Sequence, residues 1–291
     1  MNASVNWRNP YAKRGRYWLK GNLHTHTTQS DGRLSPEQVV RIYEGMGYGF
    51  LSITDHGRIS SGNGVKSDLV LLPGVEAGPQ HMCIIARDRA AIEFGKTHTS
   101  QQRITRNVKR GNVVFLGHPD WRPREHYTLE ELKALTGYTG IEIYNSVIER
   151  LAGAALSTAK WDRLLSSGRR VLGFATQDAH KEGDHRDCCS VVHVNSKSRA
   201  SVLNALQRGN FYCYYGVTIT DLGRARNRVR VATENARLIR FVGQHGQVLA
   251  KVKGKCAEHA FDETPATEYI RIECLGVGEQ ISWSQPFFRE G

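Results

Sequence analysis

The sequence predicts an α/β fold in which a barrel-like domain is followed by a small antiparallel β module. Short apolar runs alternate with amphipathic helical patterns over the first two-thirds of the chain, as in βα units. After Gly216 the helical spacing ends, and short alternating runs separated by Gly, Asn, Asp and Glu take its place. The 291 residues are enough for one large domain and one small module. We therefore expect domains at residues 1–216 and 217–291.

The strands expected in the first domain are its short apolar runs. They cover residues 18–24, 50–55, 69–76, 82–86, 113–118, 140–144, 171–176 and 191–195. The first expected helix has Ser35 as its N-cap and Pro36 at its first position, and it ends at Gly47. A second begins at Thr128, which forms a capping box with Glu131. Further helices are expected at about residues 147–166 and at 199–208.

The formal charge of +12 favours anionic ligands. The excess lies in an N-terminal stretch, in a predicted helix and in a period-two run near residue 227, which would place four arginines on one face of a strand. We favour a solvated edge strand for that run over binding to a nucleic-acid backbone. The basic residues of the three places are Arg8, Lys13, Arg14, Arg16 and Lys20; Arg103, Arg106, Lys109 and Arg110; and Arg224, Arg226, Arg228 and Arg230.

Sequence patterns also bear on the compartment. No apolar run is long enough to cross a membrane, and the first 20 residues are polar and basic instead of carrying an apolar signal region. None of the six cysteines falls into a C-x-x-C pair. We expect reduced thiols, no membrane association and a cytoplasmic location.

Histidines and carboxylates follow the predicted strands one after another. His24 and His26 leave the end of the first strand as an H-x-H pair, whose rings project to the same side of an extended chain. Because carboxyl ends of parallel strands open on one face, the polar residues after the other strands should converge there as well. These residues are His56, Glu76, His81, His118, Asp178 and His180.

Such a set of side chains is typical of a metal centre. Imidazole and carboxylate ligands without thiolate suit Zn, Mn or Fe, and more than four of them indicate more than one ion. Asp55 is expected to orient a ligating histidine, and Glu142 either lines the pocket or makes local hydrogen bonds. No role is predicted for the histidines that show no such pattern, which are His98, His126, His193, His245 and His259.

The motifs H-x-H-T-x-x-S-D-G, T-D-H, G-x-E, G-H-P and D-A-H occur in this order and resemble the polymerase and histidinol phosphatase (PHP) family over residues 16–216. A looser similarity, through residues 141–145, 161–165 with 173–176, and 283–288, links the chain to metallohydrolases related to carbaryl and carbofuran hydrolases. One departure from the PHP pattern is Gln177, where a small or acidic residue commonly precedes D-A-H.

The resemblance implies a distorted (β/α)7 barrel with two or three divalent metal ions. It implies a first ion held by His24, His26 and Asp178, with Glu76 bridging to a second ion on His81 and His118. A third ion would lie on Asp31, His56 and His180. Catalysis is assigned to Glu76, Asp178 and His180, and candidates for gripping a phosphate are Arg58, His185 and Arg186.

These features predict a metal-dependent hydrolase, most simply a phosphoesterase that uses a metal-activated water. Its substrate would be a small phosphorylated molecule or a short oligonucleotide. Three alternatives stay open: a carbamate or carboxylic ester hydrolase with the same centre, a 5′-to-3′ exonuclease, and a metal-free binding module. The C-terminal module is expected to supply no metal ligand, because every candidate precedes it.

Overall fold

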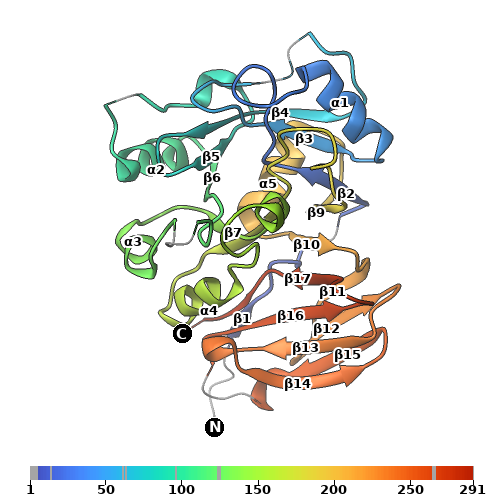
Figure 1. The fold of residues 1–291 in the computed structure, drawn as a ribbon. Coiled ribbons are helices and arrows are strands. Elements are labelled where there is room, and N and C mark those ends of the chain that lie inside the picture. Colours follow the sequence, from blue (N-terminus) through green and yellow to red (C-terminus); the bar gives the residue numbers. More distant parts are fainter. Residues whose placement is uncertain are drawn as a thin grey trace.

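The computed structural model describes residues 6–290 except 14, 61, 63, 96, 123–125 and 264–266, so Arg14 of the basic N-terminal stretch lies outside the described residues. The alternating part of the chain, blue to yellow in Figure 1, forms a curved sheet with helices on its outside. The strands that follow, orange to red, gather in a second layer beside it (Figure 1). The mixed α/β class predicted from the sequence is confirmed.

The curved sheet contains every strand predicted for the first domain. Its strands occur in the order β10-β9-β2-β3-β4-β5-β6-β7-β8, and β10 (Phe211–Tyr215) continues into the second layer through β17 (Ile281–Ser284). Neighbours are parallel from β2 to β4 and from β6 to β8. The bounds are β2 Tyr17–Asn22, β3 Phe50–Ile53, β4 Val70–Ala77, β5 Met82–Ile85, β6 Val113–Leu116, β7 Gly140–Asn145, β8 Leu172–Thr176 and β9 Cys188–Val194.

Strand β5 interrupts the parallel pattern. It runs antiparallel to both β4 and β6, so its first residue, and not its last, lies where the parallel strands end. Because His81 immediately precedes β5, this reversal brings it to the same edge as the residues that follow β3, β6 and β8.

The predicted seven-stranded barrel is not seen as a closed ladder. In the described part of the chain, no ladder joins β8 back to the other end of the sheet, so the number of barrel strands stays a prediction. One parallel bridge, between Thr25 and Ala179, links the segments that follow β2 and β8. The His26 amide donates to the Ala179 carbonyl at 2.9 Å and the Asp178 amide to the His24 carbonyl at 2.8 Å. The backbones that follow β2 and β8 are therefore hydrogen-bonded at the edge where the metal-binding residues were predicted.

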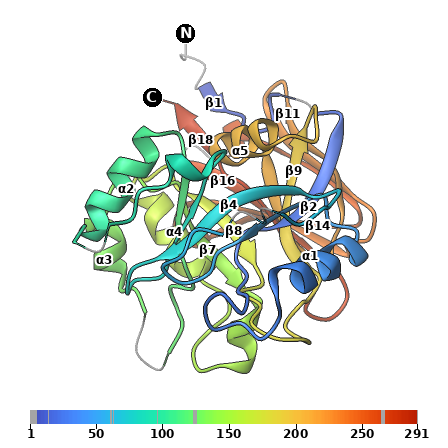
Figure 2. The same ribbon diagram turned by 90° about the horizontal axis from the view of Figure 1, so that it is seen from above.

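The helices are short and capped by side chains. Figure 2, seen from above, shows α1, α2 and α3 around the outside of the sheet. Ser35 caps α1 as predicted, Thr128 caps α3 with the predicted capping box, and the 199–208 prediction coincides with α5. Among the described residues, every helix is too short or too polar to cross a lipid bilayer. The helices are α1 Pro36–Gly45, α2 Ser100–Lys109, α3 Leu129–Ala134, α4 Thr158–Ser166 and α5 Arg199–Arg208, with short 3-10 turns η1 Arg89–Ala91, η2 Ser146–Arg150, η3 Gln244–Gly246 and η4 Phe261–Glu263.

Two predictions of local structure were wrong. The helix expected at residues 147–166 is divided into η2 and α4, because Gly153 has φ +118° and bridges to Trp121. The arginine run also does not occupy one strand face. A turn at Arg226, with φ +52°, separates β11 from β12, so Arg224 and Arg230 lie on different strands. Arg230 pairs with Asp221 at 2.8 Å.

The second layer is antiparallel throughout its described strands. A separate three-stranded sheet has the order β11-β12-β15. The predicted boundary between residues 216 and 217 stays a prediction, since β10 before it pairs with β17 after it. The bounds are β1 Asn6–Arg8, β10 Phe211–Tyr215, β11 Ile219–Ala225, β12 Arg228–Thr233, β13 Leu238–Val242, β14 Val248–Lys253, β15 Cys256–Ala260, β16 Tyr269–Leu275, β17 Ile281–Ser284 and β18 Phe287–Glu290.

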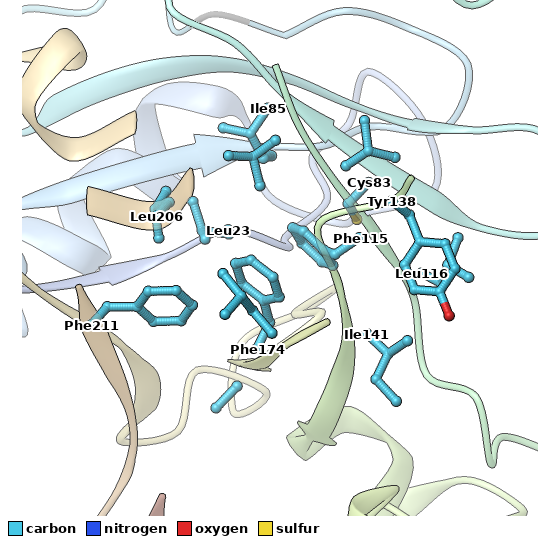
Figure 3. Close-up of a cluster of buried hydrophobic side chains, with 14 of the residues drawn as sticks. Leu23, Cys83, Ile85, Phe115, Leu116, Tyr138, Ile141, Phe174, Leu206 and Phe211 are labelled. Atoms are coloured by element: carbon cyan, nitrogen blue, oxygen red, sulfur yellow. The ribbon is translucent and has the colours of Figure 1, made fainter. Parts of the chain in front are cut away.

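The core of the curved sheet is aromatic and aliphatic. Phe115 of β6 stacks on Phe174 of β8 with ring centroids 4.6 Å apart, and Phe174 contacts Phe211 of β10 at 5.1 Å. Figure 3 shows these rings among Leu23, Leu206 and other buried side chains. Burying a side chain of this size stabilises the fold by about 1.5–3 kcal/mol. The strands are therefore fixed by packing below the edge where their polar residues meet.

Candidate metal centre

Every residue predicted as a metal ligand lies in one cluster at the edge where the parallel strands end. The side chains come from segments that are far apart in the sequence, and each contacts at least one oppositely charged partner of the set within 4 Å. Only Asp31 and His56 are substantially open to solvent, with side chains 53% and 36% exposed. The cluster consists of His24, His26, Asp31, His56, Glu76, His81, His118, Asp178 and His180.

Glu76 is at the middle of this cluster and is 1% exposed. Its two carboxylate oxygens face different imidazoles. Oε1 lies 3.0 Å from His81 Nδ1 and 3.4 Å from His118 Nε2. Oε2 lies 3.0–3.4 Å from a ring nitrogen of each of three further histidines, which are His24, His26 and His56. One carboxylate thus separates two groups of nitrogen donors.

Two further carboxylates complete the arrangement. Asp178 Oδ1 lies 3.3 Å from His24 Nε2 and 3.1 Å from His26 Nε2. Asp31, on the loop after β2, lies 3.4 Å from both His26 and His180 and 3.5 Å from His56. Ligand atoms of three groups approach one another within 4.8 Å, which is close enough for each group to hold a cation: His26, Asp31, His56 and His180; His24, His26 and Asp178; and His24, Glu76 and His118.

Several buried nitrogen and oxygen atoms of the described centre have no hydrogen-bond partner. Among the described residues, both oxygens of Glu76, Asp178 Oδ1 and the Nε2 atoms of His24 and His26 find no hydrogen-bond partner. Such atoms cost about 1–3 kcal/mol each when nothing satisfies them. They all face the same space, and they are the nitrogen and oxygen donors that divalent ions accept. The residues present therefore fit divalent metal ions.

The electrostatics of the metal-free centre agree with a site for cations. Burial would raise the pKa of Glu76, but the charge of His24 and the contacts of neighbouring imidazoles lower it well below its usual range. Burial would likewise lower the pKa of His26, yet contacts with Asp178 and Glu76 raise it to about 9. Protonated imidazoles thus supply the positive charge that the carboxylates require when no metal is bound.

Glu142 has a definite place behind the centre. Its Oε1 accepts hydrogen bonds from His24 Nδ1 and Thr176 Oγ1, both at 2.7 Å. Its Oε2 accepts from the His118 amide at 2.7 Å and from Asn145 Nδ2 at 2.8 Å. Of the two interpretations left open by the sequence, the structure therefore favours local hydrogen bonding. A carboxylate on Nδ1 fixes the tautomer and orientation of His24 with Nε2 toward the centre.

Asp55 holds a loop of the centre and contacts a ligating histidine through Ser30, whose Oγ lies 3.4 Å from His26 Nδ1. Its role in orienting a histidine stays a prediction. Asp55 accepts hydrogen bonds from the Thr27 amide at 2.7 Å, from Ser30 Oγ at 2.8 Å and from Ser60 Oγ at 2.7 Å. These bonds hold the loop that carries Asp31. Gly32 belongs to the same loop, and a Cβ there would lie 2.6 Å from the backbone of Thr27, so the tight path requires glycine.

Three of the clustered residues have left-handed backbone conformations, which are uncommon for residues with a side chain. The φ angles are +50° at His81, +30° at His118 and +52° at Asp178. Conformations of this kind cost about 1–3 kcal/mol each and persist where surrounding structure enforces them. Gly117 shows how closely the chain is held, since its amide donates to the His81 carbonyl at 3.0 Å and a Cβ would come within 2.6 Å of that oxygen.

Gln177, where the sequence departs from the PHP pattern, is buried beneath the Asp178 turn. Its side chain accepts a hydrogen bond from the Tyr43 hydroxyl at 2.9 Å and donates to the Cys188 carbonyl at 2.9 Å. The backbone amide of Gln177 donates to Asn22 Oδ1 at 3.1 Å. Gln177 therefore fixes the turn that carries Asp178 and does not alter the set of candidate ligands.

The residues predicted to grip a phosphate lie outside the cluster of ligands. Arg186 pairs with Glu149 at 2.8 Å, and the His185 ring packs edge-on against Tyr43 with centroids 5.4 Å apart. Arg58 is exposed on the turn after β3. Their role in substrate binding stays a prediction.

Two aromatic side chains at the centre were not predicted from the sequence. His126 and Trp121 lie on the segment after β6, and their rings contact His81 and His118 at centroid distances of 5.0–5.5 Å. His126 follows no strand and belongs to no repeated spacing, so only the path of this segment could have revealed it.

Comparison with known proteins gives a fold relationship. No family model matches the sequence, and no curated protein matches it. Among solved structures, a two-domain protein containing a predicted PHP-like metal-dependent phosphoesterase from Bacteroides vulgatus ATCC 8482 is similar with a TM-score of 0.51 and 16% identity, over 100% of this chain and 90% of that chain. A proposed metal-dependent phosphoesterase from Bifidobacterium adolescentis ATCC 15703 gives a TM-score of 0.40 and 16% identity, over 56% of this chain and 88% of that chain. The chain therefore shares the fold of the two-domain structure from Bacteroides vulgatus that contains a predicted PHP-like metal-dependent phosphoesterase.

Proposed function

We propose that the chain is a metal-dependent hydrolase that cleaves a phosphomonoester or phosphodiester. The observation that carries the proposal is the position of Glu76, a buried carboxylate whose two oxygens face two separate sets of imidazoles. A carboxylate so placed can serve two cations at once. A metal-free binding module would have no need of these unpaired buried atoms, whose cost only a ligand offsets.

The ligand assignment keeps the three sets expected from the sequence, and the donors for the first and third ions fall within groups whose ligand atoms approach within 4.8 Å. His24, His26 and Asp178 would hold the first ion, and Glu76 would bridge it to a second ion on His81 and His118. Asp31, His56 and His180 would hold a third. Zn, Mn and Fe are the candidate metals, because all these donors are nitrogen or oxygen.

Neighbouring residues of the chain position the candidate metal ligands. When bound, a pair of divalent ions lowers the pKa of a shared water and stabilises negative charge on phosphoryl oxygens. Glu142 and Asn145 hold His24 and Asp178 in place, and Glu76 offsets the repulsion between neighbouring cations. His180, 25% exposed and 3.4 Å from Asp31, lies toward solvent, where it can contact substrate during catalysis.

The proposed substrate is a small phosphorylated molecule or a short oligonucleotide. Support comes from the formal charge of +12, which attracts anions from solution. The alternative is carbamate or carboxylic ester hydrolysis at the same centre, and the experiment has to distinguish it from phosphoester hydrolysis.

The test combines metal analysis with a substrate panel. The purified chain should carry at least two equivalents of Zn, Mn or Fe, and it should hydrolyse a compound from a panel of phosphomonoesters, cyclic phosphates, short oligonucleotides and aryl carbamates. Chelation should abolish the activity, and added metal should restore it. Turnover of carbamates alone would contradict the phosphoesterase assignment. One tightly bound ion or none would contradict the multinuclear centre.

A further inference from the structure

A triangle of imidazoles lies on one side of Glu76. The rings of His81, His118 and His126 are each 5.0 Å from the other two, measured between centroids. One ring nitrogen from each histidine lies within 4.8 Å of the others, close enough for the three to hold one cation. The proposed function uses only two members of this triangle, His81 and His118.

The third member, His126, has an unsatisfied ring nitrogen. Its Nε2 is buried and finds no hydrogen-bond partner among the described residues. An imidazole nitrogen without a partner is the kind of donor that a divalent ion of this class accepts. A histidine that served only packing would not require an unsatisfied nitrogen at this position.

Trp121 covers the triangle. Its indole contacts His81 and His126 at 5.5 Å and His118 at 5.0 Å, so it restrains all three rings. The Trp121 amide also donates to the His118 carbonyl at 3.1 Å, and the Tyr127 amide donates to the Pro119 carbonyl at 3.0 Å. These bonds fix both ends of the segment that carries His126.

We infer that His126 is a further ligand of the second metal position, beside Glu76, His81 and His118. This inference rests on the proposed function, since it adds a donor to an ion that the proposal already places there. The second position then has three imidazoles and one carboxylate oxygen. Three imidazoles are the nitrogen set of a well-known class of catalytic zinc sites, so the second position should select Zn or Co over Mg.

The decisive experiment is His126→Cys loaded with Co²⁺, because a thiolate bound to cobalt gives a charge-transfer absorption that an imidazole does not. We expect this absorption in the variant, measured as a difference from wild type with the same number of bound ions. The matched control is His245→Cys, an exposed histidine of the second layer, which should give no such band. A second variant, His126→Ala, should bind one Co²⁺ at least about tenfold more weakly and the remaining ions as wild type does.

The outcomes separate the inference from the proposed function. If wild type binds several Co²⁺ ions, but His126→Cys shows no added absorption and His126→Ala keeps wild-type affinity at every position, His126 is not a ligand and the proposed centre stands without it. If wild type binds no Co²⁺, the metal centre itself is wrong and the inference fails with it. Should the cysteine variant not fold, the affinities of His126→Ala decide.

Discussion

The candidate metal centre and the buried ion network between α4 and β16 both place carboxylates against cationic side chains, but only the network is satisfied by the chain itself. In the network, Asp162 accepts two hydrogen bonds from Arg271 and one from the Tyr269 hydroxyl, at 2.7–2.8 Å. Arg271 also donates to Glu273 at 2.7 Å. At the metal centre, by contrast, the buried oxygens of Glu76 find no hydrogen-bond partner among the described residues.

This difference distinguishes a structural cluster from a site for a ligand. Arg271 presents fixed donors that match the Asp162 carboxylate in a bidentate pair, so the network needs nothing from solution. The imidazoles around Glu76 approach it without hydrogen-bond geometry, and three nearby residues hold left-handed backbones. Both clusters consist of buried charged groups, yet only the candidate metal centre leaves unpartnered nitrogen and oxygen atoms that face a shared space.

The largest expected effect comes from Glu76→Gln. The substitution preserves side-chain volume but removes the charge that offsets two close cations, so at least one ion should be lost and turnover should fall by at least about 10³-fold. Elemental analysis and rates on the best substrate measure both. Glu93→Gln is the control, because Glu93 pairs with Arg106 and Arg110 away from the centre. Full metal content with near-normal turnover in Glu76→Gln would end the bridging assignment.

Breaking the buried ion network should affect stability and leave metal binding intact. Arg271→Met strands the buried charges of Asp162 and Glu273, and we expect the free energy of unfolding to fall by about 3–5 kcal/mol. Urea unfolding measures this, with Arg41→Met in the exposed pair with Glu44 as a control that should cost less than about 1 kcal/mol. If Arg271→Met folds but binds fewer metal ions than wild type, the two clusters are not independent and the distinction between them is wrong.

Glu142→Gln tests the residue behind the centre. Glutamine keeps the volume but weakens the acceptor for His24 Nδ1, so the affinity for one ion should fall about 10–100-fold. Competition with a chelating dye measures the change, and the effect on turnover should be smaller than that of Glu76→Gln. Unchanged affinity would show that His24 is oriented by packing alone.

The smallest effect concerns the pH dependence of the metal-free protein. The pKa of His26 is raised from 6.5 to about 9, so its contribution to stability is complete below pH 6.5 and is lost as the pH rises through 9. We expect metal-free wild type to lose about 1–3 kcal/mol between pH 6.5 and 9. Thermal and urea unfolding measure it, and His26→Gln should flatten this profile. Since metal must displace the proton, metal affinity should rise over the same range.

Much of the fold and of the cluster could be predicted from the sequence, for local reasons. Apolar runs identify strands, and Ser35 and Thr128 mark helix starts because their side chains bond the first free amides. Ligands placed after strands converge because strand ends share an edge. These signals depend on neighbours in the sequence.

The remainder depends on contacts between distant segments. Residues 147–157 have a helical pattern, but bridges from Trp121 to Gly153 and from Tyr144 to Leu156 hold them in another path. His126 owes its place to the segment that Lys160 ties down through the Pro119 carbonyl at 2.9 Å. Since no local pattern encodes those contacts, neither the interrupted helix nor the third imidazole could be predicted from spacing.

The bridge between Thr25 and Ala179 joins two segments that are far apart in the sequence, next to the candidate metal ligands. The two residues are 154 positions apart, and His26 and Asp178 lie directly beside them. An ion shared by these neighbours is a cross-link that closes a very long loop, and a covalent link over about 100 residues restricts the unfolded chain by about 4–5 kcal/mol. Each of the six cysteines is a free thiol. Metal can therefore serve as this chain's reversible counterpart of a disulfide, linking the segment after β2 to the segment after β8.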